Sequence, residues 1–160
     1  MDKIIERQEQ TNNLIIKYKL KPTSSICDYD YDPIRPARRF IGTFSHELGF
    51  LDRVTEIEKM KLKFSSETCA EFITALYKFL YGTPSLVVSV RDIYIDGSPT
   101  PIIITLSKIL NRSGNENIIQ ISYTHNNVYS SIILNDEELN IIVDCLGSSD
   151  DMIMDIFIDY

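Results

Sequence analysis

The sequence has no lysine or arginine after Arg112, although this final stretch carries nine of the 23 acidic residues. All 16 basic residues therefore lie in residues 1–112, where they outnumber the other 14 acids (23 minus nine) by two. The whole chain has a formal net charge of −7. An acidic stretch without cations repels nucleic acid and attracts basic partners.

Other absences exclude whole classes of protein. No apolar run approaches the roughly 18 residues that a membrane-spanning helix needs. The N-terminal sequence MDKIIERQEQTNN has no apolar segment, so we expect no signal peptide. No glycine-rich phosphate-binding motif is present. The three cysteines are odd in number and have no CxxC spacing, which favours buried free thiols and a cytoplasmic location; they are Cys27, Cys69 and Cys145.

The two histidines give no convincing catalytic or zinc site. No HExxH motif and no Cys/His pair with zinc spacing occurs. His46 stands between Ser45 and Glu47, but adjacent side chains rarely form a dyad because a strand directs them to opposite faces. We interpret this segment as a polar loop before a helix or strand. His125 precedes two asparagines and is interpreted as a hairpin-turn residue.

An alternating acidic run is the only candidate for a metal site. Asp28, Asp30 and Asp32 resemble the start of a calcium loop, but Pro33 and Arg39 stand where that loop needs glycine and glutamate. We interpret the run as a solvated or partner-facing loop. The sequence therefore predicts no metal site, no cofactor and no catalytic residue, and we expect a protein that is not an enzyme. An enzyme whose active site assembles from residues distant in sequence, without a motif, stays a third alternative.

Strict alternation predicts two half-buried strands at residues 14–21 and 58–64. In each segment apolar side chains occupy one face and lysines the other. If both strands belong to one sheet, the lysines share one outward face, with arginines at its edge. These basic residues are Lys17, Lys19, Lys21, Lys59, Lys61, Lys63, Arg38 and Arg39.

The remaining elements follow from periodicity and turn residues. Helical spacing predicts one helix that starts between residues 65 and 68 and a second helix at 136–146. Residues 39–44 indicate a short strand with Gly42 as a bulge. Alternating or continuous apolar segments between turn signals predict strands at 86–95, 101–110, 118–125 and 128–134.

These elements predict an α+β fold, in which two helices pack on one or two antiparallel β-sheets. We expect a single domain over residues 1–160. The two strand-to-helix junctions align without a gap at an offset of 70, which suggests a pseudo-duplicated βββα unit. The halves are 13–82 and 83–147, followed by an acidic C-terminal segment, 148–160. The same arrangement also arises without duplication.

The order of three strands and a helix in each half is loosely similar to single-stranded-DNA-binding folds of the PC4 and Whirly type. No family-specific motif accompanies this order, and the overall acidity departs from a simple basic binder. The sequence therefore identifies no family.

Two binding hypotheses remain. The first is an inhibitor or immunity-type protein that neutralises a basic partner, such as a nuclease toxin, through an acidic surface. That surface comprises Asp136, Glu137, Glu138, Asp144, Asp150, Asp151, Asp155 and Asp159. The second is a single-stranded nucleic-acid-binding protein that uses the lysine face. Its weak point is stacking, since Tyr18 and Phe64 fall on the inward side of their strands.

Overall fold

The computed structural model describes residues 4–22, 29–30, 39–40, 44–81, 87–95, 97–109 and 118–147. Eight strands form one antiparallel sheet in the order β1-β2-β5-β6-β7-β8-β9-β10, and two helices accompany it. The strands are β1 (Ile5–Gln10), β2 (Leu14–Pro22), β5 (Phe44–Asp52), β6 (Glu58–Ser65), β7 (Val87–Ile95), β8 (Ile102–Ile109), β9 (Ile118–His125) and β10 (Val128–Leu134). The helices are α1 (Ser66–Leu80) and α2 (Asp136–Gly147). The predicted α+β class is confirmed.

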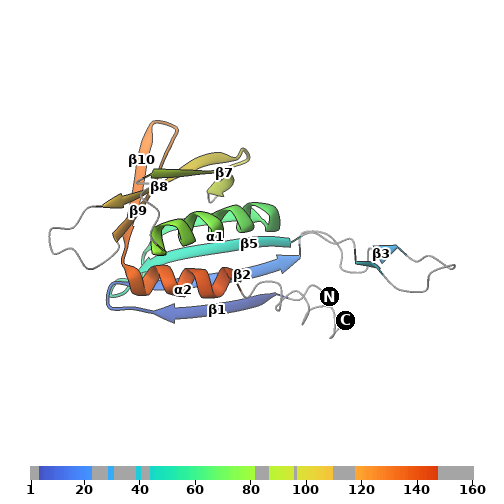
Figure 1. The fold of residues 1–160 in the computed structure, drawn as a ribbon, viewed down its shortest axis with the longest axis horizontal. Coiled ribbons are helices and arrows are strands. Elements are labelled where there is room, and N and C mark those ends of the chain that lie inside the picture. The colour runs from blue at the N-terminus through green and yellow to red at the C-terminus, as the bar shows by residue number, and fades with distance from the viewer. Residues whose placement is uncertain are drawn as a thin grey trace.

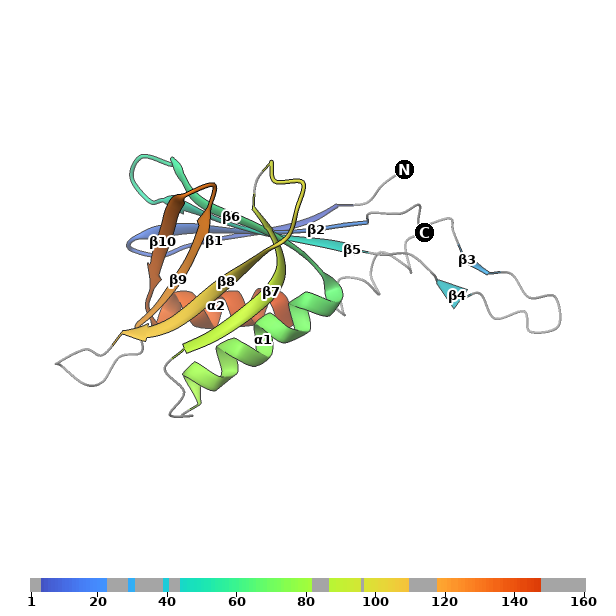
Figure 2. The same ribbon diagram turned by 90° about the horizontal axis from the view of Figure 1, so that it is seen from above.

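Each half of the chain contributes four strands of the large sheet followed by a helix (Figure 1). The sequence predicted all four strands of the second half, but only three in the first half, where β1 was missed. Only two residue pairs, Leu62↔Ile95 and Lys63↔Tyr94, join β6 of the first half to β7 of the second. The strands of the second half turn away from those of the first (Figure 2). Duplication of the unit stays a prediction, as does the domain boundary.

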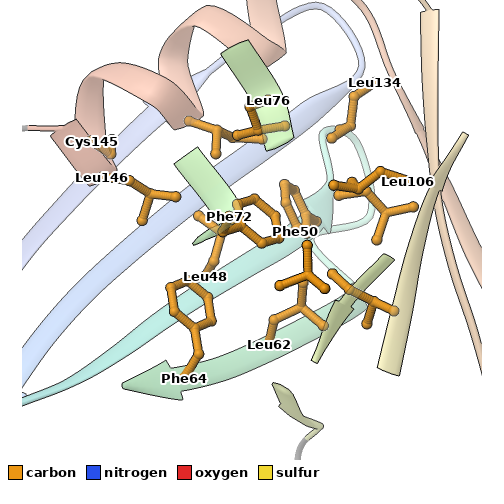
Figure 3. Packing of buried hydrophobic residues seen from close by; sticks show 14 of the residues in the cluster. Leu48, Phe50, Leu62, Phe64, Phe72, Leu76, Leu106, Leu134, Cys145 and Leu146 are labelled. Atoms are coloured by element: carbon orange, nitrogen blue, oxygen red, sulfur yellow. The ribbon is translucent and has the colours of Figure 1, made fainter. Parts of the chain in front are cut away.

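A single hydrophobic cluster draws on both halves. The inward side chains of β5 and β6 meet α1, where Phe64 and Phe72 have ring centroids 5.6 Å apart (Figure 3). Leu106 and Leu134 bring the second half into the same cluster. The helices lie beside each other on this inward side, so the opposite faces of the strands are left for other contacts.

Residues 39–44 differ from the prediction. Two short elements replace the single strand: β4 (Arg39–Phe40), which pairs with β3 (Tyr29–Asp30) in a separate two-stranded sheet, and the start of β5. Gly42 lies outside the described residues. The segment around His46, interpreted above as a polar loop, is the centre of the long strand β5.

His46 occupies an inward position on β5 because both ring nitrogens have hydrogen-bond partners. The Nδ1 atom is 2.6 Å from the Tyr18 hydroxyl, and the Nε2 atom is 2.8 Å from the Ser66 Oγ. A buried polar group without partners would cost a few kcal/mol. These bonds tie β5 to β2 and to the first residue of α1, which is a structural role.

Both helices begin at polar caps separated by 70 positions, as the aligned junctions predicted. The Ser65 Oγ accepts a hydrogen bond from the Thr68 N–H at 3.2 Å. The Asn135 side chain accepts from the Glu138 N–H, and the Glu138 carboxylate accepts from the Asn135 N–H, both at 3.0 Å. This reciprocal pair is a capping box.

The Glu138 carboxylate also fastens α2 to the first hairpin. It accepts a hydrogen bond of 2.8 Å from the Thr11 hydroxyl, in the turn between β1 and β2. Only 1% of Glu138 is exposed, so it does not belong to an exposed acidic surface as predicted. Its neighbour Glu137 is exposed, whereas Glu138 lies four residues before Ile142 and so shares the buried face of α2.

Replacing Glu138 with alanine should lower the free energy of unfolding by about 2 kcal/mol, because two hydrogen bonds to a buried carboxylate are lost. Urea denaturation followed by circular dichroism measures this change. The control is Glu137→Ala, which should change the free energy by less than about 0.5 kcal/mol. Equal changes in the two variants would contradict the assigned role of Glu138.

Candidate functional site

The six lysines of β2 and β6 lie on one outward face, as the alternation predicted. The residues between them on each strand are buried against the helices. Strand β5 lies between β2 and β6 and pairs with both in antiparallel register. We call this surface the lysine face. It consists of Lys17, Lys19, Lys21, Lys59, Lys61 and Lys63.

Three of these lysines are balanced by carboxylates. Lys19 lies 3.4 Å from Glu6, Lys63 lies 3.7 Å from Glu47, and Lys59 lies 3.8 Å from Asp52. Hydrogen bonds from the Thr55 backbone N–H and hydroxyl lower the pKa of Asp52, so this acid stays ionised beside Lys59. Exposed ion pairs of this kind contribute little stability.

The other three lysines have no ion pair within the described residues. Lys17 and Lys61 flank Gly49 in one row across β2, β5 and β6. Lys21 lies four residues further along β2, opposite Ser45. The Cβ of an added side chain at Gly49 would come no closer than 4.0 Å to its neighbours. In this row one lysine therefore lies on each side of Gly49, which has no side chain.

A groove of about 610 Å³ opens beside this row, where β5 and β6 meet the end of β7. Its lining combines Lys61 and Lys63 with the aromatic side chains of Phe44 and Tyr94. Tyr94 is directly opposite Lys63 in the register of β6 and β7, and 37% of it is exposed. Residues directly opposite in an antiparallel pair share a face. Tyr94 thus supplies an aromatic ring at the edge of the lysine face.

Tyr94 was missed in the sequence because a bulge changes the alternation of β7. The register shifts between Val90 and Ile93, both of which are buried, and Asp92 has a positive φ of 61°. Simple alternation from Val90 would direct Tyr94 inward. The predicted inward positions of Tyr18 and Phe64 are confirmed, since 1% and 2% of these residues are exposed.

The described acidic residues of α2 do not form one open surface. Besides the buried Glu138, the Asp144 carboxylate accepts a hydrogen bond of 2.9 Å from Arg7 on β1, and this bond raises the pKa of Arg7. Asp136 and Glu137 are in the first turn of α2, where negative charge is favourable. Asp150, Asp151, Asp155 and Asp159 lie outside the described residues.

The remaining predicted sites contribute little. Arg38 lies outside the described residues; Arg39 is in β4, but its side chain is not described. Among the described residues no cluster of three metal-ligating side chains occurs, and no helix is long and apolar enough to cross a membrane. Cys69 and Cys145 are buried, as predicted, and burial raises the pKa of Cys145.

Comparison with known proteins gives a distant structural likeness. No family model matches the chain, and no curated protein matches it. Among solved structures, WHY3 from Arabidopsis thaliana is similar at a TM-score of 0.47 and 10% sequence identity, over 89% of this chain and 84% of that one. A likeness of this size leaves the function to be argued from the site itself.

Proposed function

We propose that the protein binds single-stranded nucleic acid along the lysine face, without catalysing a reaction. The observation that carries this proposal is the meeting of cations and an aromatic ring at one groove, where Lys61, Lys63 and Tyr94 come together. Single strands are held by cationic grooves that follow the phosphates and by aromatic side chains on which bases stack. The proposal reverses the order of the two hypotheses drawn from the sequence.

The distribution of ion pairs supports phosphate binding at one part of this face. Lys17 and Lys61 have no carboxylate partner in the described chain, and Gly49 between them is buried but leaves room for an added Cβ. A phosphate bound there gains charge-assisted hydrogen bonds without breaking an existing ion pair. The acidic residues in the rest of the chain repel an approaching nucleic acid. At physiological ionic strength, salt screens this repulsion beyond about 8 Å.

The groove also supports a single strand over a duplex. The rings of Tyr94 and Phe44 border a space of about 610 Å³, which suits one unstacked base with its sugar. A base inside a duplex is stacked on both sides and offers no free face to Tyr94. Duplex of equal length should therefore bind more weakly than the single strand.

The inhibitor hypothesis has less support from the described residues. Glu138, one residue of its predicted acidic surface, is buried, and Asp144 forms an ion pair with Arg7 although 72% of the Asp144 side chain stays exposed. A basic protein partner stays a prediction that rests on the charge of the C-terminal third. Association with such a partner would be slowed by reversing the charge of Asp144, because peripheral charges mainly steer encounter.

Binding to a labelled single-stranded oligonucleotide should weaken steeply with salt. Contacts from the three unpaired lysines predict a slope of log K against log salt of about −2. Replacing Lys61 with glutamate should make this slope shallower by about 0.7, because one phosphate contact is lost. Fluorescence anisotropy over a salt series measures both values.

The control is Lys78→Glu, which changes the net charge equally but lies on α1, on the other side of the sheet. Binding by this variant should match the wild type. If the two variants weaken binding equally, the effect is one of net charge and the lysine face is not the site. Absence of salt-dependent binding by the wild-type protein would refute the proposed function.

A second experiment tests the Gly49 row without removing any lysine. Gly49→Glu places a carboxylate between Lys17 and Lys61, whereas Gly49→Gln adds a side chain of the same shape without charge. The glutamate variant should lose oligonucleotide affinity about tenfold or more relative to the glutamine variant. Equal affinities, with matched melting temperatures, would exclude this row from the interface.

A third experiment tests stacking in the groove. Tyr94→Ala should weaken binding by about 1–3 kcal/mol, the usual loss for one base–aromatic contact. The matched control is Tyr81→Ala, at an exposed tyrosine on the C-terminal end of α1. Fluorescence anisotropy at fixed salt measures both. Unchanged affinity of the Tyr94 variant would show that the phosphates alone hold the strand.

A further inference from the structure

The outward face of the second half differs in chemistry from the lysine face. Across β8, β9 and β10, no outward position in the described residues carries a charged side chain. On β7 the charge-free area reaches Ser89 and ends at Arg91, the next residue in the same alternation. We call this surface the neutral face. A chain with a net charge of −7 thus keeps one large sheet surface without charge.

The neutral face has a regular relief. The register places Ser89, Thr105, Ser122 and Ser131 in one row of small hydroxyl side chains. Bulky apolar residues stand on either side of that row. Their exposed fractions are 58% for Val87, 51% for Ile103, 61% for Tyr129 and 57% for Ile133. Isolated exposed apolar residues are normal, but four on one charge-free face indicate a surface that is covered in the functioning molecule.

We propose that a second copy of this chain covers the neutral face, so that the protein is a dimer with a twofold axis. Nucleic acid finds no cation on this face, and a basic or acidic partner finds no charge to pair with. Two copies of an acidic protein repel each other wherever acids meet, and they approach best through a surface that has none. Twofold dimers are also the commonest symmetric assembly.

The relief of the face is complementary to itself. A twofold axis along the hydroxyl row places Ile103 of one copy opposite Ser107 of the other, so that a large side chain meets a small one. On β7 it places Arg91 of one copy near Val87 of the other, at the border of the interface. The same axis brings Ile133 against Tyr129. The result is a face-to-face sandwich with the two sheets about 10 Å apart.

The area sets the expected strength. The neutral face comprises 26 residues, three on β7 and eight, eight and seven on β8, β9 and β10. At about 3.3 Å per residue and about 4.8 Å between strands, it covers roughly 400 Å² per copy. The two copies together bury roughly 800 Å², which is below the usual size of a specific interface, so we expect a weak dimer with a dissociation constant of roughly tens of micromolar.

Sedimentation equilibrium of the full chain from about 1 to about 100 μM tests the dimer. The wild-type protein should approach twice its mass of 18.4 kDa as concentration rises. The variant with Ile103→Lys and Ile133→Lys should remain at 18.4 kDa, because charged side chains would be buried opposite Ser107 and Tyr129 of the other copy. The control variant with Val54→Lys and Tyr81→Lys carries the same added charge at exposed apolar sites elsewhere, and it should dimerise normally.

Ser131→Arg is a second disrupting variant at an exposed position, in case the double variant has a lowered melting temperature. A monomeric wild-type protein throughout this range would overturn the proposal, as would a dimer that survives both disrupting variants. Loss of the dimer in the control variant would overturn it as well. The experiment contains no nucleic acid, so its outcome is independent of the proposed binding function.

Discussion

At the junction of β6 and β7 only two residue pairs hold the two halves of the sheet together. Because the strands turn there, one face of the sheet closes on the helices while the outward faces of the two halves diverge. The turn also creates the groove, since it brings the end of β7 beside Lys61 and Lys63. A continuous flat sheet with longer β6–β7 pairing would have neither this groove nor two separate outward faces.

Periodicity predicted the regular elements with high accuracy. The strands at 118–125 and 128–134 and the start of the helix at 136 agree with the structure, because apolar alternation and turn residues coincide there. Asn126 and Asn127 adopt the positive φ angles of a tight hairpin turn, which asparagine tolerates. Sequence signals were reliable wherever burial alone decided the conformation.

The failures have specific physical causes. Strand β5 was missed because His46 occupies an inward position and Gly49 an outward one, so the apolar alternation is interrupted twice. Tyr94 was missed because a bulge reverses which side chains of β7 face inward. Both causes depend on partners distant in the sequence, such as Tyr18 for His46 and the strand β8 for the bulge. The candidate site lies where local patterns stop being informative.

Because side chains alternate along each strand, inward and outward positions are under different evolutionary constraints. Inward positions such as Leu48 and Leu62 must keep their volume, because they share one packed cluster with both helices. Outward positions such as Lys61 and Ser122 touch solvent or a partner and can change without disturbing that cluster. Each outward face can therefore acquire or lose a ligand while the scaffold stays the same. A family built on this scaffold would share its pattern of apolar positions and differ in its surfaces.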